Sequence, residues 1–393
     1  MSGQIQIHTL SAREVLRGVH QAGWDDSVCA IRLTPAQCCA LASNPALQGL
    51  DSPMQIIAVR GNRVIGRINF VAGDVCLRAN KVPQILKVPV LWGSSLFVPP
   101  EERRSMAGTL IMMRMATVAS TVGANGPSQM ALPMYARLGF AALPLERFIL
   151  LRRSQSVVNR FVPNAAVRAG ARVVADVGLS CVRTVNAIRG VLASIRIRRL
   201  SSMPSEFELA LAEPPPDYHP NGGAGVLPRA WGLRSVAVVD WWLANKLTTE
   251  GRHERALYLV ESREGTPIGY ILMKLKFYTT ASHHNIPNIT LATLADGRVF
   301  QPKLRDTLGS IVSHRALIHA AIMAAGQLSA DGLEVCVQRD KADTTFMKSL
   351  GFIRAGTMTC MIKASVGSPL HGPAFPNETS WNAQYAEGDN VLS

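Results

Sequence analysis

The sequence predicts an α/β protein with mixed sheets, made of two similar units in tandem that are joined by a basic amphipathic helical linker. Two features that occur in both halves of the 393-residue chain support this fold class. The first is an apolar hairpin with an Ile-Gly pair in its second strand, at 56–71 and again at 257–275. The second is a segment ending in Leu-Gly-Phe, at 134–140 and 346–352. Because the two features are similarly spaced in each half, two copies of one α/β unit explain the pattern.

The predicted organisation is a first unit at 1–151, a linker at 152–200, a second unit at 201–366 and an extended tail at 367–393. The chain is long enough for two domains, and 48% of its residues are hydrophobic, which is sufficient for two cores. Segment 213–232 is rich in proline and glycine and is predicted to be a loop.

Two early helices are predicted from their start signals. Ser11 with Glu14 and Thr34 with Gln37 have the spacing of capping boxes, and Pro35 stands at the first helical position of the second helix.

The net charge of +14 is concentrated in the linker, where 152–200 holds ten arginines, one aspartate and no lysine. A helical projection of 167–200 separates two faces. The apolar face carries Val173, Val177, Cys181, Ile188, Val191, Leu192 and Ile195, and the other face carries Arg168, Arg172, Arg183, Arg189 and Arg196. The linker is therefore predicted to be a basic amphipathic helix or helix pair.

Three interpretations of this linker are open. Its apolar face could pack on the units and leave the arginines solvated, or it could attach residues 152–200 to an anionic membrane surface. Binding of RNA, including tRNA, is the least favoured of the three, because no aromatic residues for base stacking are interleaved with the arginines.

The seven cysteines form no C-x-x-C pair, and the chain opens without an apolar signal segment. These observations predict a cytoplasmic protein, with attachment to the inner membrane face as a possible role of the linker. The apolar run at 316–330 is too short to span a bilayer. His283, His284, His314 and His319 lack a cysteine or carboxylate at ligand spacing, so no metal site is predicted.

The segment 96–113 contains a predicted phosphate site. An apolar strand ends at two prolines, and a turn with Arg103 and Arg104 leads into an apolar helix. The first backbone N–H groups of a helix have no partner within it, so this helix start beside two cations could hold a phosphate.

These residues resemble the GNAT superfamily of N-acetyltransferases over about 1–151. The matching positions are Val98, Pro100, Arg103, Met106 and Gly108, followed by Ala131, Tyr135, Gly139 and Phe140. The sequence departs from the family pattern at Met106, which replaces the first glycine of the pyrophosphate loop. A second departure is that 116–129 shows no clear strand before Tyr135.

The resemblance implies an acyl-CoA co-substrate, most simply acetyl-CoA, and no metal. The residues implied to bind it are Leu96, Phe97, Val98, Arg103, Arg104, Ser105, Met106, Ala107, Gly108 and Thr109. Tyr135 matches the family's proton donor to the departing thiolate, and its alternative interpretation is a core tyrosine. Glu101 and Glu102 are conceivable bases, although charged residues in a turn are usually solvated, and no base is assigned.

The second half is similar in its hairpin and in 346–352, but its middle segment lacks the pyrophosphate loop, and Met347 stands where the acid tyrosine would be. The resemblance thus implies one competent unit and one degenerate copy. Such tandems are similar to acetyltransferase-like proteins of surface polysaccharide biosynthesis and to Fem-type transferases.

The predicted function is an acyl-CoA-dependent N-acyltransferase whose acceptor is an amine of a sugar, a glycan precursor or a small metabolite. The alternatives are a Fem-like aminoacyl-tRNA-dependent transferase and a non-catalytic scaffold at a membrane surface.

Overall fold

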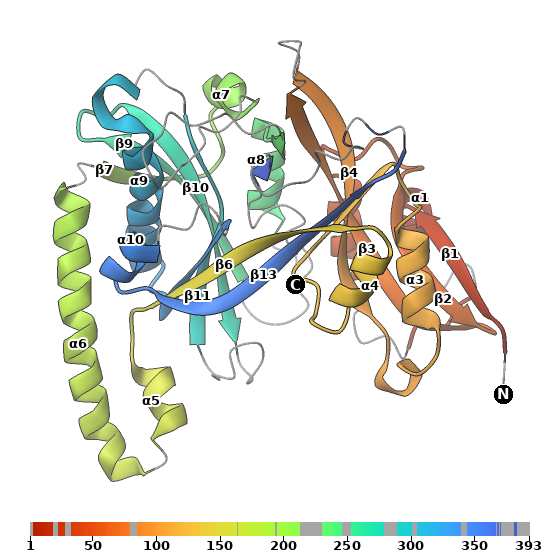
Figure 1. Ribbon diagram of the computed structural model, residues 1–393, viewed down its shortest axis with the longest axis horizontal. Helices are drawn as coiled ribbons and strands as arrows, with labels where there is room; N and C mark the ends of the chain where they lie inside the picture. Colours follow the sequence, from red (N-terminus) through yellow and green to blue (C-terminus); the bar gives the residue numbers. More distant parts are fainter. Residues whose placement is uncertain are drawn as a thin grey trace. The chain divides into compact units, whose positions relative to one another are not determined.

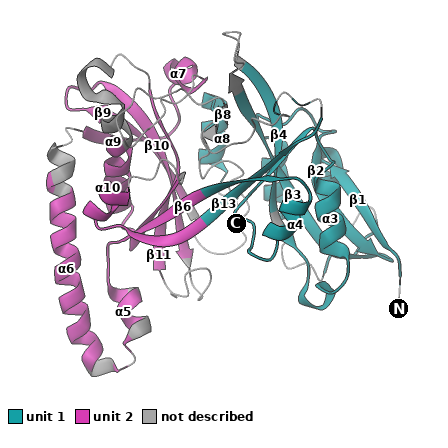
Figure 2. Cartoon of the chain, viewed as in Figure 1, with its two compact units in different colours: residues 1–144, 228–249, 358–393 teal, residues 145–227, 250–357 magenta. Residues whose placement is uncertain are grey.

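The computed structural model describes residues 3–18, 23–27, 33–78, 85–162, 164–192, 195–212, 230–245, 253–278, 289–300, 305–338, 344–366, 368, 370 and 381–382. The chain forms two compact units, both of mixed α/β structure, as predicted (Figure 2). Unit 1 contains residues 1–144, 228–249 and 358–393, and unit 2 contains residues 145–227 and 250–357.

Unit 1 is built on one mixed sheet (Figure 1). Its strands, in spatial order, are β1 (Ile5–Ser11), β2 (Pro53–Arg60), β3 (Arg63–Arg78), β4 (Ile85–Phe97), β5 (Thr121–Asn125) and the C-terminal part of β13 (Ile353–Ala364). Neighbouring strands are antiparallel except for the parallel pair β4 and β5. The short strand β8 (Ala230–Gly232) pairs with β3 and with β14 (Trp381–Asn382).

The helices of unit 1 are α1 (Ala12–Arg17), α2 (Pro35–Ala42), α3 (Ala107–Met115), α4 (Leu132–Arg137) and α8 (Val236–Ala244), with a 3-10 turn, η2 (Pro100–Glu102). Both predicted capping boxes are present, at Ser11 and Thr34. Helix α3 packs Ile111, Met112 and Met115 on the sheet in a core that includes Ile56, Ile68 and Phe70.

Strand β5 lies in the segment where the sequence showed no clear strand. Its sequence, Thr-Val-Gly-Ala-Asn, has a low content of large apolar residues. The reason is the packing of Trp92, whose ring lies over Gly123 so closely that a Cβ there would be 2.3 Å from it. A strand that must leave space for an indole ring has a weak sequence signal.

Unit 2 also contains mixed β-sheet. Its strands, in spatial order, are β6 (Ala141–Leu151), β12 (Gly332–Gln338), β11 (Ile289–Val299), β10 (Pro267–Tyr278), β9 (His253–Ser262) and β7 (Ile195–Leu200). Its helices are α5 (Gln155–Phe161), α6 (Ala165–Leu192), α7 (Glu208–Ala212), α9 (Arg305–Gln327) and α10 (Thr344–Ser349), with a 3-10 turn, η3 (Ser205–Phe207).

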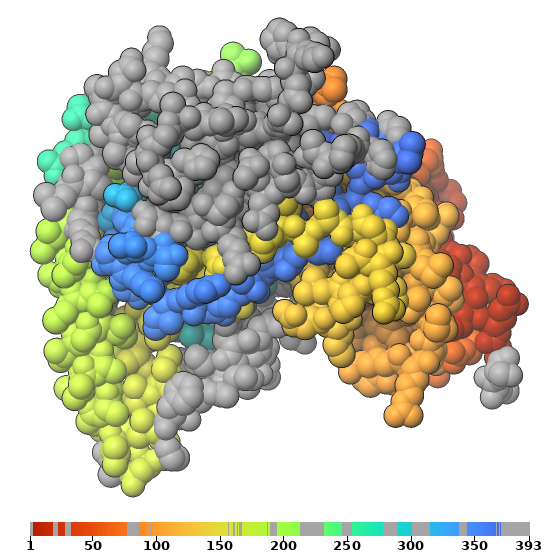
Figure 3. All heavy atoms as spheres, in the orientation of Figure 1, coloured from red at the N-terminus to blue at the C-terminus, as the bar shows by residue number. Residues whose placement is uncertain are grey.

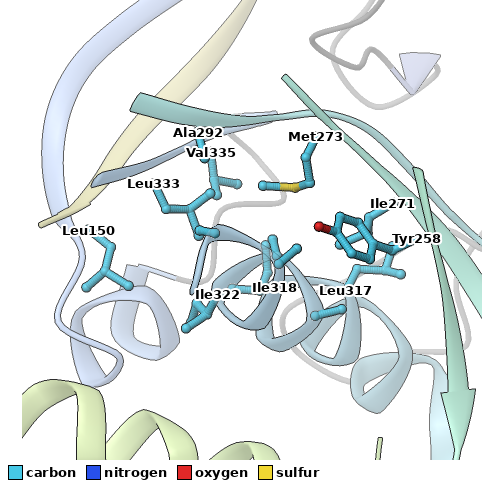
Figure 4. Close-up of a cluster of buried hydrophobic side chains, with 14 of the residues drawn as sticks. Leu150, Tyr258, Ile271, Met273, Ala292, Leu317, Ile318, Ile322, Leu333 and Val335 are labelled. Carbon is cyan, nitrogen blue, oxygen red and sulfur yellow. The ribbon is translucent and has the colours of Figure 1, made fainter. Parts of the chain in front are cut away.

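The core of unit 2 lies between its sheet and α9. Ile318 of α9 points toward Met273 of β10 (Figure 4), and Leu317, Ile322 and Ile271 belong to the same buried cluster. The alanine-rich middle of α9 is completely buried, which explains the apolar run at 316–330.

Each unit completes its sheet with a strand from the other half of the sequence. In unit 2, residues 145–151 of β6 pair with β12, and in unit 1, residues 360–364 of β13 pair with β5. The two compact units therefore do not contain the same residues as the predicted ranges 1–151 and 201–366. Those ranges remain a prediction of where the two repeats lie in the sequence.

The repeated Leu-Gly-Phe segments form the same helix end in both units. Gly139 and Gly351 have left-handed φ values of 81° and 85°. The next N–H, of Phe140 or Phe352, donates to the carbonyl of Tyr135 or Met347, five residues earlier, at 3.0 Å in both cases. This is a Schellman-type cap, in which glycine is favoured because it adopts φ > 0 without steric cost.

The glycine shared by the two hairpins also has a structural reason. A Cβ on Gly66 would lie 2.9 Å from Ile111 Cδ1, and a Cβ on Gly269 would lie 2.2 Å from the carbonyl oxygen of Arg298. Both glycines therefore allow a close approach that no larger residue could make.

Gly269→Ala is expected to destabilise unit 2 by about 3 kcal/mol, because its Cβ would meet backbone that cannot move without disturbing the β10–β11 pairing. The measurement is urea unfolding followed by circular dichroism. Gly178→Ala is the matched control: no atom lies within 4 Å of its Cβ, and the helix should gain up to about 1 kcal/mol. Equal stability of the two variants would contradict the argument.

The linker differs from its prediction in two respects. Residues 195–200 form strand β7, which pairs with β9, so Ile195 is in a sheet and not on a helix. Within α6, the packed side carries Val182 and Asn186, whereas the described side chains of the predicted apolar face are exposed. The exposed side chains of that face are Val173, Val177, Cys181 and Ile188, and Val174 and Val185 next to them are exposed as well. The helix forms part of the molecular surface in Figure 3.

Within the described part of the chain, no helix is both long enough and apolar enough to cross a bilayer. The predicted loop at 213–232 lies outside the described residues except for β8, and so do His283 and His284. The cysteines that the structure describes are free thiols.

Candidate functional site

The parallel strands β4 and β5 pair over a short distance and then separate. Residues Leu91–Gly93 pair with Val122–Ala124, whereas β4 continues to Phe97. Residues 94–97 of β4 consequently have no partner on β5. This unpaired end contains Leu96 and Phe97, and Val98 follows directly.

A tight turn connects this strand end to α3. The N–H of Glu102 donates to the carbonyl of Pro99 at 2.9 Å, and the N–H of Ser105 donates to that of Glu102 at 2.9 Å. The Glu102 carboxylate accepts a hydrogen bond of 2.9 Å from the Arg60 guanidinium. This ion pair fixes the turn on β2 and engages Glu102, which is therefore a poor candidate for a catalytic base.

The start of α3 presents unpaired donors. Within the described residues, the N–H groups of Arg104, Met106, Gly108 and Thr109 have no backbone or side-chain acceptor. Ser105 Oγ accepts a long bond of 3.4 Å from Ala107, and the N-cap residue Met106 makes no side-chain cap. The turn thus leaves the positive end of the helix dipole open.

The predicted cofactor residues lie together at this place. Arg103 and Arg104 are exposed beside the helix start, and Met106 is 58% exposed. Gly108 sits against the strand end, since a Cβ there would be 3.4 Å from Val98 Cγ2. A set of free N–H donors beside two guanidinium groups fits a phosphate or pyrophosphate.

Tyr135 lies in the core of unit 1 and not at its surface. Its side chain is 3% exposed, its ring contacts Phe140 edge to face, and its hydroxyl donates to Met115 Sδ at 3.8 Å. Burial raises the pKa of Tyr135 to about 12, so the phenol keeps its proton at neutral pH.

One side chain separates this phenol from the point where β4 and β5 part. A Cβ on Gly93, the last β4 residue in the parallel pairing, would lie 2.6 Å from the methyl group of Met115. Met115 therefore lies between the Tyr135 hydroxyl and Gly93. This geometry fits both interpretations of Tyr135, as a proton donor to the thiolate and as a core residue.

In unit 2, the parallel strands β11 and β12 separate as β4 and β5 do in unit 1, but the pyrophosphate-loop motif is absent from the sequence. Residues Leu291–Thr293 of β11 pair in parallel with Gly332–Glu334 of β12, and both strands then continue unpaired with each other. Residues 301–304 lie outside the described residues. Met347, at the position that corresponds to Tyr135, is buried in the core.

Unit 1 contains a set of buried polar residues that the sequence motifs did not reveal. Gln55, Arg67 and Asn69 are each no more than 2% exposed, in strands that are otherwise apolar. The spacing of Arg67 and Asn69, two residues apart within an apolar hairpin, could have identified them as side chains on one face.

No protein-family model and no curated protein matches the sequence. Among solved structures, N-myristoyltransferase of Saccharomyces cerevisiae with bound myristoyl-CoA is similar over 97% of this chain and 84% of that chain, with 12% identity and a TM-score of 0.52. A further structure of that enzyme, with myristoyl-CoA and inhibitors, matches over 93% and 81%, with 12% identity and a TM-score of 0.53. The chain therefore shares the overall fold of this acyltransferase.

A tandem GNAT protein from the clavulanic acid biosynthesis pathway also matches, with 13% identity over 92% of this chain and 98% of that chain, at a TM-score of 0.43. At these identities the likeness concerns the fold.

Proposed function

We propose that this chain is an acyl-CoA-dependent N-acyltransferase whose co-substrate site lies at the start of α3 in unit 1. The observation that carries the proposal is the group of free N–H donors of Arg104, Met106, Gly108 and Thr109, beside the end of β4 that does not pair with β5. The solved structures of similar fold bind an acyl-CoA, which supports the same assignment.

Each part of the site has a separate task. The N–H groups of Gly108 and Thr109 and the guanidinium groups of Arg103 and Arg104 would hold the pyrophosphate. The free edge of β4 at Leu96–Val98 would hydrogen-bond the extended arm and orient the thioester carbonyl. The thioester supplies the acyl group for transfer to the acceptor amine.

Proton movements then depend on this chain. Nitrogen–carbon bond formation releases a proton from the amine, and cleavage of the carbon–sulfur bond leaves a thiolate that takes one up. Tyr135 Oη holds a proton near neutral pH and would supply it from the α3 side of the sheet.

The test is calorimetric titration of the full chain with acetyl-CoA, with ATP as a polyanion control because the net charge of +14 attracts phosphates without selectivity. Saturable binding of acetyl-CoA that ATP does not reproduce is expected. A parallel titration with myristoyl-CoA determines which acyl length the site accepts.

Absence of selective binding to any acyl-CoA would overturn the proposal. The tRNA-dependent and scaffold alternatives would then be tested by tRNA binding as a function of salt concentration and by turnover with amines.

A second role is favoured by the orientation of α6. Its exposed stripe contains Val173, Val174 and Val177, each more than 60% exposed, and arginines lie on the other sides of the helix. We propose that this stripe contacts an anionic membrane surface, to which each basic residue near the surface adds about 1 kcal/mol.

Co-sedimentation with phosphatidylserine-containing vesicles is expected to exceed that with phosphatidylcholine vesicles by at least about tenfold in apparent affinity. Val173→Asp with Val177→Asp should abolish the binding. If both vesicle types bind equally, or if the variant binds as well as the parent, the membrane role is wrong.

A further inference from the structure

One face of the unit 1 sheet, opposite to α3, carries a row of polar side chains. In the strand register, Gln55 of β2 stands opposite Asn69 of β3, and Asn69 stands opposite Ser94 of β4. All three are buried, at 1%, 0% and 3% exposure. Their apolar neighbours Ile56, Ile68 and Phe70 point to the α3 side, so the polar residues lie on the other face.

The hydrogen bonds of this row are incomplete. Gln55 Nε2 donates to Asn69 Oδ1 at 2.7 Å, which leaves Gln55 Oε1 as a free acceptor and Asn69 Nδ2 as a free donor. Both atoms are fully buried and have no partner among the described residues.

The next row on the same face adds two further groups. Arg67 Nη2 donates to Asp26 Oδ2 at 3.0 Å in an ion pair whose side chains are 3% and 5% exposed, whereas Arg67 Nε has no partner. His8, which stands opposite Ile57 on the adjacent strand, has a buried Nε2 atom without a partner. Each of four polar residues on three neighbouring strands thus has one buried atom without a hydrogen-bond partner. They are His8, Gln55, Arg67 and Asn69.

Without a ligand, these unpaired buried atoms lower the stability of the folded protein. Burial removes polar atoms from water, and the cost is recovered when a partner replaces the water. Buried polar groups in proteins are almost always paired, so several unpaired atoms gathered on one face mark a place where a polar molecule can complete them.

The row also leads to the candidate site. Ser94 is the first β4 residue beyond the last pair with β5, and it lies two residues before Leu96. In the strand register Ser94, Asn69 and Gln55 follow one another from β4 to β2, so the row begins next to the point where β4 and β5 part.

We propose that this polar face is the acceptor-binding surface, and that the acceptor is a polyhydroxylated amine such as an amino sugar or amino polyol. The inference rests on the proposed function for the identity of the reacting group, which is the amine. The remainder of the acceptor is what Gln55, Asn69 and Arg67 bind.

The chemistry of the free atoms selects this class. They comprise an acceptor, Gln55 Oε1, and donors, Asn69 Nδ2 and Arg67 Nε, and a hydroxyl group can serve both kinds. The positive charge of Arg67 is compensated by Asp26, so a carboxylate or phosphate has no uncompensated cation to bind. An apolar amine would leave every free atom unpaired.

The experiment compares acceptors by calorimetry without acetyl-CoA and by thiol release with it. The panel contains glucosamine, galactosamine, mannosamine and 1-amino-1-deoxysorbitol, with cyclohexylamine and hexylamine as apolar amines of the same charge. At least one polyhydroxylated amine is expected to bind at least about tenfold more tightly than both apolar amines.

The double variant Gln55→Met with Asn69→Leu removes the free atoms at similar volume. It should lose this preference, bind acetyl-CoA within about twofold of the parent, and keep or raise Tm, because unsatisfied buried groups are gone. Asn44→Leu is the matched control. Asn44 is buried in the same unit with both ends of its amide bonded, so its replacement should lower Tm and leave the preference intact.

Two results would overturn the inference: no panel member binds better than the apolar amines, or the double variant retains the preference. Failure of the proposed function would give a different result. Acetyl-CoA would not bind, whereas the polyhydroxylated amines would still bind to the parent and not to the double variant.

Discussion

Gly108→Trp is expected to abolish saturable acetyl-CoA binding, with a loss of about 100-fold or more in affinity. The indole group would stand at the helix start and displace a phosphate from the N–H groups of Gly108 and Thr109. Two charge-assisted hydrogen bonds at about 1.5 kcal/mol or more each account for this loss. Calorimetric titration with acetyl-CoA measures it.

Gly108→Ala is the control for this variant. Its Cβ would make an ordinary contact of 3.4 Å with Val98 Cγ2, and no positive φ prevents the substitution. The Ala variant should fold like the parent, with a stability change of no more than about 1 kcal/mol. If the Trp variant binds acetyl-CoA as the parent does while its circular dichroism is native, the site lies elsewhere.

Tyr135→Phe is expected to lower kcat by roughly 10²- to 10⁴-fold without changing the affinity for acetyl-CoA, because it removes the proton that the phenol supplies. The substitution keeps the ring packing against Phe140 and loses a weak bond to Met115 Sδ. Steady-state kinetics and calorimetry on the same preparation make the comparison. An unchanged kcat would establish Tyr135 as a core residue.

The pH dependence of stability provides a separate measure of how deeply the Tyr135 phenol is buried. Burial raises its pKa from the usual 10.0 to about 12, so above pH 10 the folded chain holds this proton and the unfolded chain releases it. The stability that the neutral phenol contributes is complete below pH 10 and is lost as the pH rises through 12.

Between these pH values the free energy of unfolding of the parent should fall by about 1.5–2 kcal/mol more than that of Tyr135→Phe. Urea unfolding of both proteins at pH 9.5 and 11.5 tests this difference. Parallel curves would mean that the phenol is solvated in the folded protein.

The repeat was predictable from the sequence because its markers have local causes. The glycines in Ile-Gly and Leu-Gly-Phe are required by close approaches and by left-handed backbone, which any copy of the unit must satisfy. The capping boxes and the turn before α3 are local for the same reason, since their hydrogen bonds join residues three apart.

Other elements were not predictable, because their residues satisfy partners far away in the chain. Strand β5 is short and glycine-containing to accommodate Trp92, and 195–200 is a strand because β9 offers an edge to it. The exchange of β6 and β13 also depends on pairing between residues about 200 positions apart, such as Leu333 with Leu150. Helical periodicity identified the apolar face of α6 but could not determine which side packs.

The sequence by itself determined the two-unit α/β fold, the open helix start proposed to bind phosphate and the candidate tyrosine, because each is specified by neighbouring residues. Tertiary structure alone decided that Glu102 forms an ion pair with Arg60 and that Tyr135 is buried beside Met115. It also decided that Gln55 and Asn69 form a hydrogen bond that leaves one polar atom of each without a partner. Burial and hydrogen-bond partners depend on which strands lie side by side, and this information is distributed over the whole chain.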